Sequence, residues 1–247
     1  MKSNINILSY NSDETIEYYK RLNTRGLFNY EQILISEYFD ENTNILDIGC
    51  GAGRTTLKLK EQGFKVVGID FSEEMIKVSK KINNTIDYQV QNIIKTNFCD
   101  NQFDGALFSF NGLMLLCSLE DRMKAMQEIN RIIRKEGIFI FTTPYLDNKI
   151  NKGYWKEKIN SYGKELNKFT EVEKIELGDE ILEDNGSKFY IHVPFLREIR
   201  KLIIDCGFSI VFEVRRLDYF NEENNEQELD DNYIWVIKNE KNRIQRN

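Results

Sequence analysis

Cysteine, proline and histidine are scarce in this sequence, which has four, two and one of them among 247 residues. The cysteines Cys50, Cys99, Cys117 and Cys206 include no pair with C-x-x-C spacing. That spacing pattern favours reduced thiols in a cytoplasmic protein over a disulfide framework or a cysteine-based metal site. We therefore expect no metal centre and no structural disulfide.

Long apolar runs are also missing. No stretch is long enough to span a bilayer, and the first residues, MKSNINILSYNSDE, lack the continuous apolar region and cleavage site of a signal peptide. We expect a cytoplasmic protein with no membrane insertion.

Positive charge is in deficit, because 34 Lys and Arg face 40 Asp and Glu, for a net charge of −6. Such a balance offers no overall basic footprint for a nucleic-acid backbone, although a local basic patch is compatible with it. The hydrophobic content of 41% is enough for one sizeable domain.

The most informative stretch is NILDIGCGAGRTT, from Asn44 to Thr56. Its apolar start is typical of a buried strand, its three glycines of a tight turn, and its end of a helix. The next strand, Lys65 to Asp70, ends in a carboxylate. A strand, a glycine-rich turn, a helix and a second strand with a terminal acid form a nucleotide-binding βαβ unit.

The charge at the turn separates two classes of nucleotide. A dinucleotide site uses G-x-G-x-x-G and places pyrophosphate at the helix N-terminus. Here the sixth position is Arg54 or Thr56 in the two possible frames, so the third glycine is absent. The pattern is instead Asp47 followed by Gly49, Gly51 and Gly53. A carboxylate there opposes NAD and suits S-adenosylmethionine, which carries an ammonium and a sulfonium and has no phosphate.

Several motifs, in order, resemble the class I S-adenosylmethionine-dependent methyltransferases. They are ILDIGCGAGRTT, VVGIDFSEEMI, FDGALFSFNGL, EINRIIRKEGIFIFTTP and, more loosely, FLREIRKLIIDCGFSIVFEVRR. The resemblance implies an α/β, Rossmann-like, doubly wound fold with a seven-stranded mixed sheet whose last strand is inserted antiparallel. It also implies one domain over residues 1–247, with N-terminal helices in 1–40 and a hairpin-bearing lid insertion in 145–193.

The cofactor residues follow from their positions in these motifs. We expect Asp70 to hold the ribose, because a carboxylate can accept from both hydroxyls of a diol; an acid at a helix N-terminus is the alternative role. Alanine at this position should weaken cofactor binding with little loss of fold. The remaining expected cofactor contacts are Asp47, Gly49, Cys50, Gly51, Gly53, Phe71, Asn92, Ile93 and Ser109.

Two of these positions depart from the family pattern. The third strand is usually followed by an acid and a small residue, and the acid binds the adenine amino group. Asn92 and Ile93 stand at those positions. The side-chain oxygen of Asn92 can still accept from an amino group, and the N–H of Ile93 can face a ring nitrogen.

His192, the one histidine, lies where the strands flanking Asp184-Asn185-Gly186 return from a predicted hairpin. Methyl transfer needs a base only when the acceptor must lose a proton, and histidine suits that role near neutral pH. The alternative is a hairpin residue that binds a backbone group or packs on a helix. Both interpretations remain open.

Aromatic residues frame the same region. Tyr10, Tyr18, Tyr19 and Tyr30 are candidate lid residues, for which packing against the sheet is the favoured role. The segment between Tyr145 and Tyr190 should select the acceptor, and its aromatic side chains can wall a small, partly apolar substrate. They are Tyr154, Trp155, Tyr162, Phe169 and Tyr190.

The sequence therefore predicts a methyltransferase that moves a methyl group from S-adenosylmethionine to an O, N or C acceptor on a small molecule by direct displacement. The alternatives are an RNA or protein acceptor, or a domain that binds S-adenosylmethionine or S-adenosylhomocysteine without catalysis. A nicotinamide oxidoreductase is disfavoured by Asp47. The oligomeric state stays open.

Overall fold

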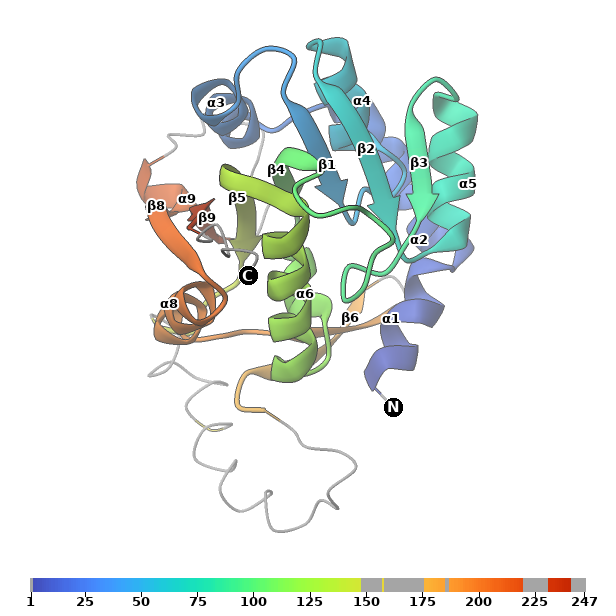
Figure 1. The fold of residues 1–247 in the computed structure, drawn as a ribbon. Helices are drawn as coiled ribbons and strands as arrows, with labels where there is room; N and C mark the ends of the chain where they lie inside the picture. The colour runs from blue at the N-terminus through green and yellow to red at the C-terminus, as the bar shows by residue number, and fades with distance from the viewer. Residues whose placement is uncertain (1, 148–156, 158–175, 185–186, 220–230, 241–247) are drawn as a thin grey trace.

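A computed structural model describes residues 2–147, 157, 176–184, 187–219 and 231–240 of the chain (Figure 1). The helices are α1 (Lys2–Tyr10), α2 (Asp13–Leu22), α3 (Asn29–Tyr38), α4 (Arg54–Glu61), α5 (Glu73–Ile82), α6 (Leu119–Ile132), α8 (Leu196–Asp205) and α9 (Arg216–Tyr219). Turns of 3-10 helix span Asn23–Arg25 and Gly112–Leu115. The strands are β1 (Asn44–Ile48), β2 (Lys65–Asp70), β3 (Asp87–Val90), β4 (Phe103–Phe108), β5 (Ile133–Thr143), β6 (Asp179–Asp184), β7 (Ser187–His192), β8 (Phe208–Arg215) and β9 (Tyr233–Asn239).

Seven strands form one sheet in the order β3-β2-β1-β4-β5-β9-β8. The first five are parallel, and β9 runs antiparallel between β5 and β8. This arrangement confirms the predicted doubly wound sheet with an antiparallel insertion. Strand order reverses between β1 and β4, which is where ligands bind in such sheets.

Helices cover both faces of the sheet and bury a separate apolar core on each (Figure 1). On one face, α6 and α8 pack against residues such as Leu46 and Ile48 of β1. On the other face, α3, α4 and α5 pack against residues such as Ile45. Because successive residues of a strand point to opposite faces, Ile45 contributes to one core and Leu46 and Ile48 to the other.

The structure corrects the predicted end of the helix that starts at Leu119. The sequence pattern predicts that this helix runs to Lys135 and is capped by Gly137, but α6 ends at Ile132 and β5 begins at Ile133. Ile133 is buried and pairs with Phe103 of β4, so tertiary packing overrides the helical pattern. Gly137 is not a helix cap: it lies in β5, where a Cβ atom would come within 2.6 Å of the Asp104 carbonyl oxygen.

The predicted hairpin is confirmed, because β6 and β7 pair antiparallel as a separate two-stranded sheet. Helix α1, which the sequence analysis did not predict, lies beside β7. Its Asn6 side chain donates to the carbonyl of Tyr190 at 3.0 Å and accepts from the N–H of Tyr190 at 2.8 Å. Tyr154, Trp155, Tyr162 and Phe169 lie outside the described residues. Among the described helices, none combines the length and apolar character needed to cross a bilayer.

Candidate functional site

A cavity of about 510 Å³ opens at the carboxyl ends of β1, β2 and β4. Helix α1, helix α2 and the segments after β3 and β4 complete its walls. Nine of the ten expected cofactor residues line it: Asp47, Gly49, Cys50, Gly51, Asp70, Phe71, Asn92, Ile93 and Ser109. Gly53 and His192 are not among the lining residues. The motif positions thus lie around one cavity, as expected for a nucleotide-binding βαβ unit.

The glycine-rich turn brings its backbone against the cavity in left-handed conformations. Gly49, Gly51 and Gly53 have φ values of 63°, 54° and 92°. A Cβ atom on Gly49 would meet the Phe108 ring at 2.8 Å, and one on Gly53 would meet the Tyr88 hydroxyl at 2.5 Å. Gly53 therefore serves the packing of α4 on the sheet.

Asp70 anchors the turn and still faces the cavity. Its Oδ2 accepts from the N–H of Gly51 at 2.9 Å, and its Oδ1 accepts from the N–H of Ser72 at 2.8 Å. A carboxylate has about four acceptor sites, so these bonds leave acceptor capacity for a diol. Burial raises the pKa of Asp70 to about 6, although these backbone N–H groups oppose the shift.

Asp47 lies beneath the turn and is only 1% exposed. Its Oδ2 accepts from the Thr56 hydroxyl at 2.6 Å. Burial raises the pKa of Asp47 to about 7, while Thr56 and the Arg54 guanidinium hold it down. A cationic ligand would favour the charged form, because an opposite charge stabilises a carboxylate.

The expected adenine contacts lie beyond Asp70. Phe71 is 39% exposed at the cavity mouth and meets the Tyr10 ring edge-on, at 5.7 Å between centroids. Ile93 is buried, and Asn92 Oδ1 accepts from the N–H of Ile94 at 3.0 Å. One acceptor site of the Asn92 oxygen is thus already used by the turn that it forms.

Sequence reasoning missed a buried ion pair at the edge of the cavity. The Arg54 guanidinium donates to both carboxylate oxygens of Glu31, at 2.6 and 2.7 Å, and lies over the rings of Phe28 and Phe110. The hydroxyl of Ser109 donates to the same carboxylate at 3.0 Å. Helix α3 is thereby tied to the glycine turn and to the end of β4. Arg54 was visible in the sequence as the residue that replaces the third glycine, but its partner is 23 positions away.

The tyrosines divide between the cavity and the core. Tyr10 and Tyr19 line the cavity, and their rings lie 5.9 Å apart. Tyr18 is 45% exposed, while Tyr30 is buried and stacks on Phe28. Asn6 and Ile7 of α1 also line the cavity. The apolar residues Ile5, Ile7 and Leu8 were the signal for that helix in the sequence.

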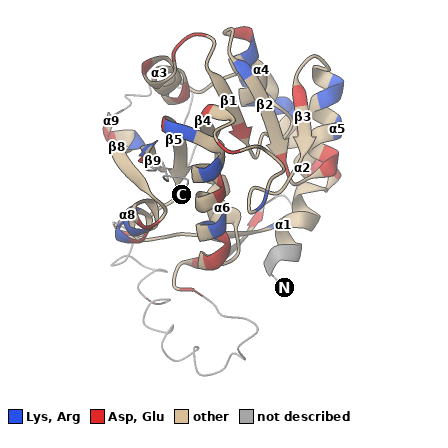
Figure 2. Cartoon of the chain, in the orientation of Figure 1, with Lys and Arg blue, Asp and Glu red and all other residues tan. Residues whose placement is uncertain are grey.

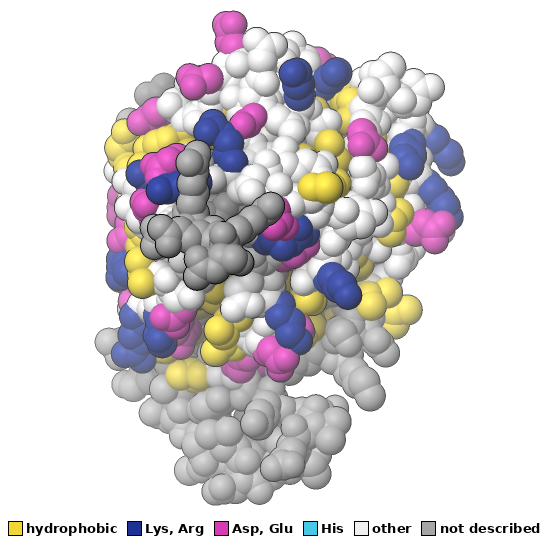
Figure 3. All heavy atoms as spheres, in the orientation of Figure 1, with side chains coloured by type: hydrophobic (Ala, Val, Ile, Leu, Met, Phe, Trp, Pro, Cys, Tyr) yellow, Lys and Arg dark blue, Asp and Glu magenta, His cyan; other side chains and the backbone are white. Residues whose placement is uncertain are grey.

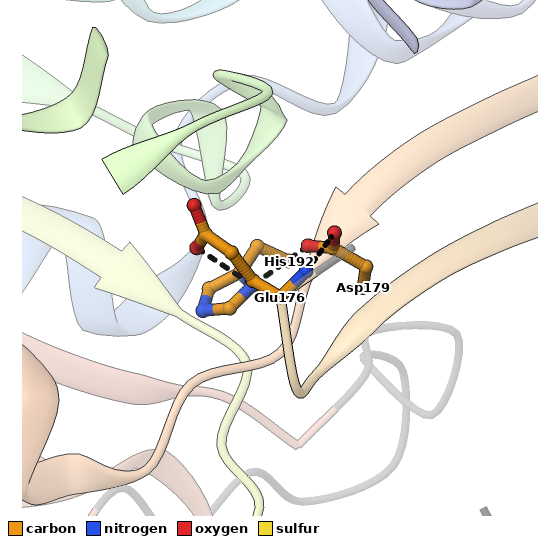
Figure 4. A group of neighbouring side chains, drawn as sticks. All are labelled: Glu176, Asp179 and His192. Carbon is orange, nitrogen blue, oxygen red and sulfur yellow. Dashed lines mark hydrogen bonds and ion pairs between the residues drawn. The ribbon is translucent and has the colours of Figure 1, made fainter. Parts of the chain in front are cut away.

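His192 lies at the end of β7 and is 4% exposed (Figure 4). Its Nδ1 is 3.0 Å from Asp179 Oδ1. Burial lowers the pKa of His192, but hydrogen bonds with Asp179 and Glu198 outweigh burial and raise it above the ordinary value. The structure brings His192 together with carboxylates behind the cavity wall and not with the expected cofactor residues. A base role for it remains a prediction.

A family model described as a methyltransferase domain matches residues 46–141, which run from β1 into β5. A protein of Methanocaldococcus jannaschii, described as uncharacterized, is 30% identical over 190 residues, 74% of this chain and 68% of that protein. Malonyl-(acyl-carrier protein) O-methyltransferase of Buchnera aphidicola is 33% identical over 139 residues. That match covers 55% of this chain, which spans about half the length of that relative, 53%.

Among solved structures, a S-adenosylmethionine-dependent methyltransferase from Methanosarcina mazei matches with a TM-score of 0.68 at 20% identity. The match covers 87% of this chain and 98% of that one. At this identity the likeness concerns the fold, and it extends well beyond the residues that the family model matches.

Proposed function

Because the chain belongs to the class I S-adenosylmethionine-dependent methyltransferases and uses S-adenosylmethionine as its cofactor, we propose that it methylates a small molecule bound beside that cofactor. The cavity of about 510 Å³ carries this proposal. Its size falls within the range of small-molecule sites, and its walls combine apolar and aromatic side chains with a few polar groups.

The residues present fit the cofactor. Asp70 would hold the ribose, because its carboxylate faces the cavity and keeps acceptor capacity beyond the bonds that anchor the turn. Asp47 would face the cationic methionine end, directly or through water. Phe71, Asn92 and Ile93 would frame the adenine.

The bound cofactor would supply a methyl group on a sulfonium. The sulfur is the already activated leaving group, and it departs as the neutral thioether of S-adenosylhomocysteine. The protein's task is then to hold the acceptor atom in line with that methyl group and to exclude water. Ile7, Phe110 and Leu115 give the cavity the apolar surface for this task. A neutral amine acceptor can attack through its nitrogen lone pair without a base. A hydroxyl acceptor would need one, and His192 would have to act past the wall formed by residues 115–117.

The charges of the cavity favour a neutral or cationic acceptor. Among the described lining residues, Arg54 is the one Lys or Arg, and Glu31 takes both of its terminal nitrogens. The other charged lining residues are Asp47, Asp70 and Asp121. An anionic acceptor would therefore meet carboxylates, while the lining cation, Arg54, is already committed to Glu31.

The surface gives less support to an RNA acceptor. Lys and Arg lie on the same helices as Asp and Glu, and several form pairs three or four residues apart, such as Lys77 with Glu74 and Lys124 with Glu120 (Figure 2). On the face drawn in Figure 3, basic and acidic side chains alternate without a continuous basic tract. A phosphate backbone is bound by clustered positive charge, so this distribution favours a small acceptor.

Calorimetric titration with S-adenosylhomocysteine, with NADH as the control ligand, tests the cofactor site. Binding of the first alone supports it, and binding of NADH alone would contradict it. Labelled S-adenosylmethionine with panels of neutral, cationic and anionic small molecules then tests the acceptor class. Transfer to anionic acceptors alone would refute the charge argument, and binding without transfer to any acceptor class would favour a non-catalytic domain.

A further inference from the structure

Residues 115–117, called here the wall segment, line the cavity after β4. Side chains from three different elements reach its three consecutive carbonyl groups. Asn6 Nδ2 of α1 donates to the carbonyl of Leu115 at 3.0 Å, and Arg122 Nη1 of α6 donates to that of Leu116 at 2.8 Å. The hydroxyl of Tyr190 in β7 lies 3.4 Å from the carbonyl oxygen of Cys117. The position of this wall therefore depends on side chains behind it.

Two of these side chains, Tyr190 and Arg122, also bind a cluster of Asp179, Glu176 and His192, whose side chains lie together in Figure 4. Asp179 Oδ1 accepts from the Tyr190 hydroxyl at 2.6 Å and lies 3.0 Å from His192 Nδ1. Asp179 Oδ2 accepts from the backbone N–H of Glu176 at 2.8 Å. The Glu176 carboxylate in turn accepts from Arg122, whose other terminal nitrogen holds the wall segment. A continuous set of hydrogen bonds thus joins His192 to the cavity wall.

Charge makes this set depend on the proton of His192. Glu176 Oε2 lies 3.8 Å from Nδ1 of the ring, and Glu198 Oε2 lies 3.9 Å from Nε2. With Asp179, three carboxylates face the ring, and Arg122 is the cation on α6 that faces the same group. A protonated ring adds a second cation, beside Arg122, for the buried Asp179 and the half-buried Glu176, whereas a neutral ring leaves these two carboxylates with Arg122. Glu198 is exposed and also interacts with Arg197, so it depends less on the ring proton.

A divalent metal ion is the competing occupant, because Glu176, Asp179 and His192 have ligand atoms within 4.8 Å of one another. The oxygens of Glu176 and Asp179 already accept hydrogen bonds from Arg122, Tyr190 and the backbone, and the Arg122 guanidinium places positive charge against Glu176. These contacts favour a proton on His192 over a metal ion.

We propose that His192 is a positioning residue, which in its protonated form holds Asp179 and, through it, the wall segment of the cavity. The inference rests on the proposed function, because it takes the cavity as the cofactor site. In consequence, cofactor affinity falls as His192 loses its proton. The raised pKa of His192 places that loss above the ordinary histidine range.

The test is calorimetric titration with S-adenosylhomocysteine of the wild type and of His192→Asn, between about pH 6 and about pH 9. The Asn Nδ2 can replace Nδ1 as donor to Asp179 but carries no charge. At the lowest pH we expect the wild type to bind S-adenosylhomocysteine roughly tenfold more tightly than the variant. At the highest pH we expect the two proteins to bind it equally. Asp47 and Asp70 titrate in both proteins, so their effect cancels in the ratio.

Tyr190→Phe provides a second variant that does not alter charge. It removes the hydroxyl that donates to Asp179 and contacts the carbonyl of Cys117. The affinity for S-adenosylhomocysteine should therefore fall several-fold at every pH. Tyr145→Phe is the matched control, because Tyr145 is buried, donates to Asp231 at 2.6 Å and does not line the cavity. Thermal melts verify that each variant is folded.

Three results would overturn the inference. The first is a ratio of wild-type to His192→Asn affinity that does not change with pH. The second is an equal effect of Tyr190→Phe and Tyr145→Phe. The third is wild-type affinity that is abolished by EDTA and restored by Zn²⁺, which would assign the cluster to a metal. Failure of the wild type to bind S-adenosylhomocysteine at any pH would instead refute the proposed function.

Discussion

Replacing Asp70 by alanine tests the placement of the cofactor most directly. The variant removes the proposed acceptor for two ribose hydroxyls, and hydrogen bonds to a charged group contribute roughly 1.5–3 kcal/mol each. We therefore expect the dissociation constant of S-adenosylhomocysteine to rise by about a hundredfold or more. Calorimetry on the wild type and the variant measures this change.

The same substitution also affects the fold, more than the sequence led us to expect. The N–H groups of Gly51 and Ser72 donate to Asp70, and both lose their acceptor in the variant. A buried donor without a partner costs about 1–3 kcal/mol. The variant also no longer has to bury a carboxylate, which offsets part of this cost. We therefore expect the free energy of unfolding to fall by about 2 kcal/mol and the Tm by about 4–8 °C.

A ligand-side change separates these two effects. S-adenosylhomocysteine without its 2′-hydroxyl should bind the wild type at least about tenfold more weakly than the complete ligand. The Asp70→Ala variant should bind the two ligands almost equally, because the partner of that hydroxyl is already gone. An equal loss in both proteins would refute the ribose contact even if the variant bound weakly.

Three further predictions concern the turn and its supports. The pKa of Asp47 is raised to about 7, so the folded state favours its proton, and charging it costs stability that builds up from about pH 4 to about pH 7. Asp47→Asn should therefore raise the Tm of the ligand-free protein at about pH 8 and weaken S-adenosylmethionine binding; an unchanged Tm would contradict the buried charge. Gly53→Ala should cost about 2–4 kcal/mol in chemical denaturation, whereas the matched Gly63→Ala should cost about 1–2 kcal/mol, because both have φ of 92° but only Gly53 has a neighbour within 4 Å of a Cβ atom. Arg54→Met should cost about 3–5 kcal/mol by leaving Glu31 buried and unpaired, and adding Glu31→Leu should restore much of it; a double variant no more stable than the single one would refute the pairing.

The parts of the fold that the sequence predicted best are those specified by residues close together in the chain. The apolar run of β1, the three glycines and the terminal acid of β2 are contiguous in the chain, so their spacing alone specifies the unit. The order of the later motifs then placed β4, β5 and the antiparallel pair. The positions of Asp47 and Asp70 at the cavity follow from the same spacing.

What sequence missed depends on partners that are distant in the chain. Ile133 is extended because it pairs with Phe103, and no local pattern contains that pairing. Arg54 acquires its role from Glu31 on α3. His192 has the residue type of a base, but its neighbours depend on the hairpin register, which places Asp179 opposite it, and on the first turn of α8, which carries Glu198.

The contact between Asn6 and Tyr190 has a consequence for how the protein is made. The two residues are 184 positions apart, and Asn6 also reaches the wall segment. The chain that emerges from the ribosome can complete β1, β2 and β4 long before Tyr190 is synthesised. Until then, α1 lacks β7, the strand beside which it packs. The cavity is therefore one of the last features to form during synthesis. Ligand binding by chains arrested at different lengths would show at which length it forms.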